Sequence, residues 1–155
     1  MRFGIRGASR LRIRVNPRKS RTVNEIVNQL LAAHVADEAL GVWRAEKKIF
    51  GVPRPPVIDP AGRAWRLGAL LIDRDGALYA TGKLTRAIVP KDFNADKSLA
   101  GEAHRDIQRA AARGSFRPGE SVNYEWTRLS ADEAQALVDP MPLEKYLADR
   151  LELLG

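Results

Sequence analysis

The sequence contains no cysteine, which excludes disulfides, thiol nucleophiles and thiolate metal sites and fits a cytoplasmic protein. No stretch approaches the roughly 18 apolar residues of a membrane-spanning helix, so we expect no membrane segment. The arginines near the N-terminus are not followed by an apolar stretch, and we expect no secretory signal. Only two histidines are present, far apart in the chain, and they lack the spacing of metal ligands. We therefore expect neither a metal nor another cofactor.

Acidic residues are absent from residues 1–21, although the whole chain has an ordinary globular composition. The 155 residues are 45% hydrophobic and 29% charged, and they carry a net charge of +7. The basic residues of this leading segment are Arg2, Arg6, Arg10, Arg12, Arg14, Arg18, Lys19 and Arg21. Subtracting these eight leaves 18 basic against 19 acidic side chains in residues 22–155. We predict a single domain, residues 1–155, with a basic leading strand segment, residues 1–21.

The leading segment alternates in a way that predicts a strand. Residues 10–15 place three arginines between three aliphatic side chains: Arg10, Leu11, Arg12, Ile13, Arg14 and Val15. A period of two is typical of a half-buried strand with one apolar face, whereas a flexible basic arm has little reason to keep it. The candidate anion-binding residues here are the three arginines together with Arg18 and Lys19.

Helix signals and turn signals divide the rest of the chain. Capping-box spacing at Thr22/Glu25 and at Ser130/Glu133 begins two of the predicted helices, and Ser98 or Asp96 caps another. Together with apolar periodicity, these signals predict helices over about 22–40, 98–113, 130–138 and 143–151, with a short helix over 42–50. The Pro- and Gly-rich residues 51–62 are expected to form a loop. Apolar runs on both sides of Asp75-Gly76 predict a β-hairpin, and residues 121–129 alternate as another strand. The predicted fold is α+β, with a mainly antiparallel sheet of about four strands around a central hairpin, covered by four or five helices.

The stretch "ALLIDRDGAL" (69–78) resembles the first motif of the haloacid-dehalogenase-like phosphatases. The resemblance implies that Asp73 attacks phosphorus and that Asp75 protonates the leaving group, with magnesium between them. The same residues form a tight-turn signal, because Asp-Gly is a favoured pair in two-stranded hairpins. A hairpin turn is the interpretation that we favour.

Several charged residues of the helix at 98–113 are further candidates. Arg105, Arg109 and Arg113 recur every four residues and could form an anion-binding ridge, although Glu102 and Asp106 lie where they can pair with them. His104 lies in the same helix between carboxylates, as a general base can, but no nucleophile accompanies it in the sequence.

Residues 63–126, in particular "WRLGALLIDRDGALYATGKLTRA" and "AHRDIQRAAARGSFRPGESVNYEW", resemble a family of small bacterial proteins, some of which are loosely labelled glutaminases. The resemblance brings no catalytic residues with it. Serine glutaminases use a Ser-x-x-Lys pair, and that pattern does not occur in this chain.

These observations favour a binding module over an enzyme. Its basic N-terminal strand would meet an anionic partner, either nucleic acid or another polyanion. Two alternatives remain: a small hydrolase acting through Asp73 and Asp75, and a purely structural arginine strand. In the second case the strand would pair with residues 130–155, which carry six acidic and two basic side chains. An exposed edge strand could also support a homo-oligomer.

Overall fold

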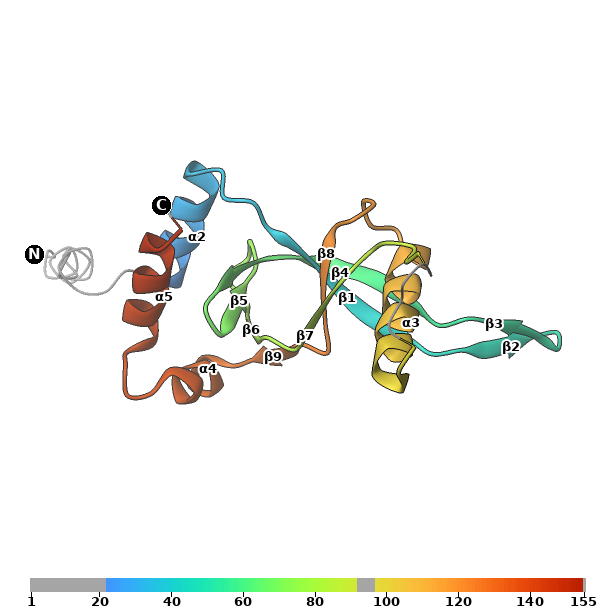
Figure 1. Ribbon diagram of the computed structural model, residues 1–155. Coiled ribbons are helices and arrows are strands. Elements are labelled where there is room, and N and C mark those ends of the chain that lie inside the picture. Colours follow the sequence, from blue (N-terminus) through green and yellow to red (C-terminus); the bar gives the residue numbers. More distant parts are fainter. Residues whose placement is uncertain (1–21, 92–96, 155) are drawn as a thin grey trace, which may run out of the picture.

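The computed structural model describes residues 22–91 and 97–154 (Figure 1). Its helices are α2 (Val23–Ala32), α3 (Leu99–Arg113), α4 (Ala131–Val138) and α5 (Leu143–Glu152). Its strands are β1 (Glu38–Arg44), β2 (Lys47–Ile49), β3 (Val52–Arg54), β4 (Val57–Leu67), β5 (Leu70–Ile72), β6 (Leu78–Ala80), β7 (Lys83–Arg86), β8 (Ser121–Tyr124) and β9 (Thr127–Leu129). The α+β class is confirmed, but the expectation of about four strands is wrong.

Seven strands form one mixed sheet in the order β7-β8-β1-β4-β5-β6-β9, and β2 and β3 form a separate two-stranded sheet. The pairing of β1 with β8 is parallel, and the other pairings are antiparallel. Because β6 pairs with β9 while β7 pairs with β8, residues 78–86 run antiparallel to residues 121–129 along two successive sections. The seven-stranded sheet therefore curls back on itself.

The interruption between these two sections has a steric cause. A Cβ atom at Gly82 would overlap the backbone carbonyl of Glu125. The two segments of the chain therefore approach each other more closely here than any residue other than glycine would permit. Next to Glu125, the Trp126 indole N–H donates to the carbonyl oxygen of Gly41 at 2.9 Å and ties this corner to β1. Short strands on both sides of such a corner are hard to recognise from a sequence. This partly explains why the sequence predicted only about four strands.

The helices form two groups rather than one cover. The helices α2, α4 and α5 enclose a core with β4, β5 and β6, whose buried side chains include Ile26, Leu30, Trp65, Leu70 and Leu147. The helix α3 packs elsewhere on the sheet, where Ala110 and Ala111 meet Ile58 and Val122. Figure 1 shows the two helical groups at separate positions along the sheet. The sheet thus packs against helices at two separate places, against α2, α4 and α5 at one and against α3 at the other.

The first helix ends earlier than predicted. The capping box of Thr22 and Glu25 is confirmed, but α2 stops at Ala32 instead of continuing to about residue 40. His34 adopts a positive φ of 54°, and its N–H and that of Val35 bond back to the carbonyls of Leu31 and Leu30. This is the hydrogen-bond pattern of a Schellman motif, in which histidine occupies the position that glycine usually takes. The sequence carried no glycine there to mark the end.

Residues 42–62 differ most from the prediction. The expected helix over 42–50 and the expected loop over 51–62 are both wrong, because β1 and β4 form a long antiparallel pair across this region. Pro60 fits inside β4 because it lies opposite Gly41, where the register shifts after Leu40. A proline that lacks an N–H is tolerated at such an irregularity. Strand pairing with a distant segment thus outweighs local proline and glycine signals.

Other local predictions are confirmed. The second capping box joins Ser130 to Glu133 at the start of α4, and Ser98 caps α3, which Gly114 ends. The predicted hairpin is the antiparallel pair of β5 and β6, and Gly76 supplies a positive φ of 85° in its turn. Within residues 22–91 and 97–154, no helix has both the length and the apolar character that crossing a membrane requires.

Candidate anion-binding site

A β-hairpin arm extends away from the body of the protein (Figure 1). The pairing of β1 with β4 ends at Arg44 and Val57, and β2 and β3 continue the same hairpin to its turn. We call residues 44–57 the arm. At about 3.3 Å per extended residue, the six steps from Arg44 to Phe50 span roughly 20 Å. The arm therefore carries its tip well beyond the last packed residues of the sheet.

The turn of the arm has an unusual composition. Ile49 pairs with Val52, so Phe50 and Gly51 form a two-residue turn, and both have a positive φ, of 52° and 77°. Such turns prefer Asn-Gly, whereas a bulky L-residue in this conformation costs about 1 kcal/mol. The Phe50 side chain is also fully exposed. Neither its backbone conformation nor its burial accounts for a phenylalanine at this position.

A groove of about 420 Å³ lies where the arm joins the body. Four of its lining residues are basic: Arg44, Lys47, Arg54 and Arg113. The other lining residues are uncharged: Ile49, Pro55 and Val57. Lys47 and Arg54 are directly opposed across the β2–β3 pair, so their side chains leave the same face of the arm. The arm thus supplies one wall of a cationic groove, and the end of α3 supplies another.

The charges of this groove are only partly compensated. Arg44 donates to both carboxylate oxygens of Asp59, at 2.8 and 3.2 Å, and these hydrogen bonds lower the pKa of Asp59. Arg113 donates to the carbonyl oxygen of Pro56 at 2.9 Å, and this neutral acceptor does not compensate its charge. Lys47 and Arg54 have no carboxylate partner among the described residues. The groove is therefore net positive and suited to an anion.

The three arginines predicted as a ridge are not equivalent. Arg105 is buried and pairs with Glu102, and Arg109 pairs with Asp106 at 2.8 Å. Of the three, only Arg113 lines the groove. The structure therefore brings one of the three predicted arginines into the candidate groove, and the carboxylates noted beside the other two are their partners. A role of the three arginines in anion binding stays a prediction.

The N-terminal candidates Arg10, Arg12, Arg14, Arg18 and Lys19 lie outside the described residues. Their assignment as a strand and their role in anion binding remain predictions. The first described residue, Thr22, caps α2.

Asp73 and Asp75 lie in the turn of the β5–β6 hairpin. One oxygen of Asp73 accepts hydrogen bonds from the backbone N–H groups of Asp75 and Ala77, both at 2.9 Å. Its other oxygen accepts from the Tyr79 hydroxyl at 2.7 Å. Asp75 is exposed. The Asp73 carboxylate thus organises the turn, and these contacts account for its presence without any catalytic role.

We expect Asp73→Ala to lower the free energy of unfolding by about 1–3 kcal/mol, because three donors lose their acceptor. Burial and the Asp73 carboxylate together raise the pKa of Tyr79 to about 12, so the variant should also titrate this tyrosine at lower pH. Denaturant unfolding and ultraviolet titration measure the two effects. Asp75→Ala, at the exposed tip, should stay within about 0.5 kcal/mol of wild type. Magnesium-dependent release of phosphate from an aryl phosphate, lost in Asp73→Asn, would contradict a purely structural role.

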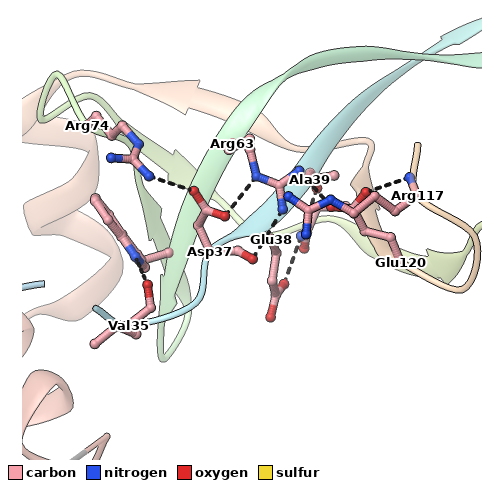
Figure 2. Close-up of polar contacts among 10 residues, drawn as sticks. Val35, Asp37, Glu38, Ala39, Arg63, Arg74, Arg117 and Glu120 are labelled. Atoms are coloured by element: carbon pink, nitrogen blue, oxygen red, sulfur yellow. Dashed lines mark hydrogen bonds and ion pairs between the residues drawn. The ribbon is translucent and has the colours of Figure 1, made fainter. Parts of the chain in front are cut away.

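A second polar cluster lies across β1 and β4 (Figure 2). Arg63 bridges Asp37, at 2.7 Å, and Glu120, at 2.6 Å, and Asp37 also accepts from Arg74 at 3.3 Å. Burial alone would raise the pKa values of Asp37 and Glu120, but hydrogen bonds and the charge of Arg63 outweigh it and lower both. Basic and acidic groups are interleaved in this cluster, so it offers an incoming ligand little unpaired charge. We assign it a structural role.

The buried Asn123 extends this polar region. Its side-chain amide donates to Glu38 at 2.9 Å and to the carbonyl of Ala39 at 3.2 Å, while its oxygen accepts from Arg66. Arg66 also pairs with Glu38 at 3.1 Å. This closed network joins β8 to β1 and β4 at the parallel pairing.

The histidines do not form a metal site. His34 ends α2, and His104 is exposed on α3. In the described part of the chain, no group of three or more His, Cys, Asp or Glu side chains could hold a metal ion.

The sequence interpretation missed the residues that make the groove and its tip, because residues 42–50 were expected to be helical. The signal that could have found them is "KKIFGVPR" (47–54). It places two residues that include a glycine between Ile49 and Val52, as in a two-residue hairpin.

No protein family model, curated protein or solved structure matches this chain. The resemblance noted for residues 63–126 therefore remains a prediction, and the functional argument depends on the residues themselves.

Proposed function

We propose that this protein is a nucleic-acid-binding module that holds the phosphate backbone in the groove at the base of its arm. The observation that carries the proposal is the set of four basic side chains that line one groove without an acidic lining residue. Arginine and lysine are the residues that contact phosphates in most protein–nucleic acid interfaces. Backbone contact of this kind is electrostatic and needs no particular base sequence.

The basic N-terminal segment is the second part of this proposal. Residues 1–21 supply eight basic side chains and no acidic one, and they precede α2 directly. Phosphate contacts from two separate segments would add to the number of counterions released and so to the salt dependence of binding.

A polyanion is a better fit to the groove than a small anion. The basic groups extend from the end of α3 along the arm to Lys47 and Arg54. Lys48, on the opposite face of β2, is exposed as well. A single phosphate could contact only a few of these groups at once, whereas successive phosphates of a nucleic acid strand can follow the whole row.

We expect Lys47→Gln/Arg54→Gln to weaken binding to a 20-base-pair DNA duplex by roughly 30- to 100-fold at about 50 mM salt, because each lost phosphate contact removes about 0.9 from the salt slope. Both positions are exposed, so the fold should remain intact. Fluorescence anisotropy across a series of salt concentrations measures the affinity and its slope. The slope should become shallower by about two.

The matched control is Lys83→Gln/Lys145→Gln, which removes the same charge from two exposed lysines away from the arm. This control should change the affinity less than about threefold, because its lysines make no phosphate contact. A third variant, with Arg10, Arg12 and Arg14 all replaced by Gln, measures the share of the N-terminal segment. Equal losses in the arm variant and the control would show that net charge alone drives binding, and would contradict the groove.

A further inference from the structure

Phe50 projects from the tip of the arm ahead of the basic groups that we assign to phosphate binding. Its side chain is fully exposed and is the most exposed of the large hydrophobic side chains in the described residues. Val52, its neighbour in the turn region, is also more than half exposed. An exposed apolar side chain at the tip of a basic arm is unfavourable in water. It would suit a binding partner whose surface is charged and whose interior is apolar.

The backbone at Phe50 strengthens this argument. With a φ of 52°, it occupies the left-handed region that asparagine or glycine adopts more readily. Gly51, with a φ of 77°, completes a two-residue turn of the kind that Asn-Gly favours. Another residue at position 50, such as asparagine, would therefore stabilise the turn at least as well as phenylalanine does. Strained positions of this kind cluster at functional sites.

The dimensions of the arm match a groove of duplex DNA. Paired strands lie about 4.8 Å apart, and two-stranded ribbons of this kind enter either groove of a duplex, including the minor groove from which apolar wedges reach base steps. Ile49 and Lys47 line the cationic groove, so the groove begins directly behind Phe50 and continues to Arg113 at the end of α3. With phosphates held in the groove by Lys47, Arg54 and Arg113, the tip can reach base pairs along the same duplex.

We propose that Phe50 is a wedge that inserts between adjacent base pairs of duplex DNA and bends the duplex at that step. The inference rests on the proposed function, since it needs the duplex to be bound by the groove. Apolar side chains that enter a base step unstack it and kink the helix, and pyrimidine–purine steps such as TA yield most readily. A single aromatic side chain cannot form the stacking platform that single-stranded ligands use, which favours a duplex.

The experiment compares three full-length proteins: wild type, Phe50→Asn and Phe50→Leu. Asparagine suits the turn and removes the apolar wedge, whereas leucine keeps an apolar wedge. A 20-base-pair duplex with one central TA step carries a donor and an acceptor dye at its ends, and 2-aminopurine at the step reports unstacking. Anisotropy on the same duplex gives the affinity and its salt slope.

We expect wild type and Phe50→Leu to raise the energy transfer between the two end dyes, which reports bending. Both should also raise the fluorescence of 2-aminopurine, which reports unstacking at the TA step. Phe50→Asn should bind about 10-fold more weakly with an unchanged salt slope and should change neither signal. Its thermal midpoint should equal or exceed that of wild type, so misfolding would not explain the loss.

Duplex binding by all three proteins without bending would overturn the wedge and leave the proposed function standing. Failure of wild type to bind the duplex at about 50 mM salt would overturn both. Tighter, Phe50-dependent binding to a single-stranded 20-mer would overturn duplex insertion. Phe50-dependent cosedimentation with phosphatidylserine vesicles, without duplex binding, would assign the tip to a membrane surface and also overturn the inference.

Discussion

Trp65→Ala is expected to lower the free energy of unfolding by about 3–5 kcal/mol, which is a large part of the roughly 5–15 kcal/mol that stabilises a typical domain. Trp65 is 2% exposed and lies in the core enclosed by α2, α4 and α5. Its indole N–H donates to the carbonyl oxygen of Val35 at 2.9 Å, and the guanidinium of Arg74 lies 5.3 Å from its ring centroid. The substitution therefore leaves a cavity and an unsatisfied carbonyl. A drop in the thermal midpoint of roughly 10–15 °C should accompany it.

Two tryptophan variants serve as controls for this effect. Trp43→Ala removes the same side chain from a position in β1 where it is 42% exposed, and it should cost less than about 1 kcal/mol. Trp65→Phe keeps most of the ring and loses the hydrogen bond, so it should fall between wild type and Trp65→Ala. Denaturant unfolding followed by far-ultraviolet circular dichroism measures all three. Equal losses at positions 43 and 65 would contradict the assignment of Trp65 to the core.

Local signals in the sequence predicted the elements whose geometry depends on neighbouring residues. The capping boxes at Thr22 and Ser130 require only a side chain and the backbone three residues away. The β5–β6 hairpin likewise depends on Asp73 and Gly76 within its own turn. Hydrogen bonds between residues that are close in sequence require particular residue types at a fixed spacing, which the sequence displays. These predictions were therefore correct.

The arm and the strand count depend on contacts between distant segments, which spacing does not reveal. Pro60 looked like a loop residue, but its place in β4 is permitted by Gly41, 19 positions earlier, at the register shift. His34 lies inside the helix predicted over 22–40, but it ends that helix in the left-handed conformation. The candidate groove was missed for the same reason, because Lys47 and Arg54 meet only when β2 pairs with β3.

Arg63→Gln is the second variant for which we expect a large loss of stability, about 2–4 kcal/mol at pH 7. Removing one partner of a buried ion pair costs about 3–5 kcal/mol, and we reduce this figure because the Arg63 side chain is 35% exposed. The variant leaves Asp37 and Glu120, whose side chains are 15% and 11% exposed, without this cation. Arg74 still compensates part of the charge of Asp37. Chemical denaturation at pH 7 measures the loss.

The pH dependence of the Arg63 variant separates lost charge pairing from lost packing. Burial opposes the ionisation of Asp37 and Glu120, but hydrogen bonds and nearby charges lower the pKa of both in the folded state. Arg63 acts on both carboxylates, together with Arg74 at Asp37 and the backbone N–H of Arg117 at Glu120. Their contribution to stability is therefore complete above the unfolded pKa of about 4 and is lost as the pH falls through the folded values. Wild type should lose more stability than Arg63→Gln between pH 7 and pH 3, so the difference between them should shrink on acidification. Arg44→Gln breaks an exposed pair with Asp59, which solvent screens, and its stability at pH 7 should differ little from that of wild type. A difference between wild type and Arg63→Gln that stays constant from pH 7 to pH 3 would mean that Arg63 stabilises the sheet by packing rather than by its two carboxylates.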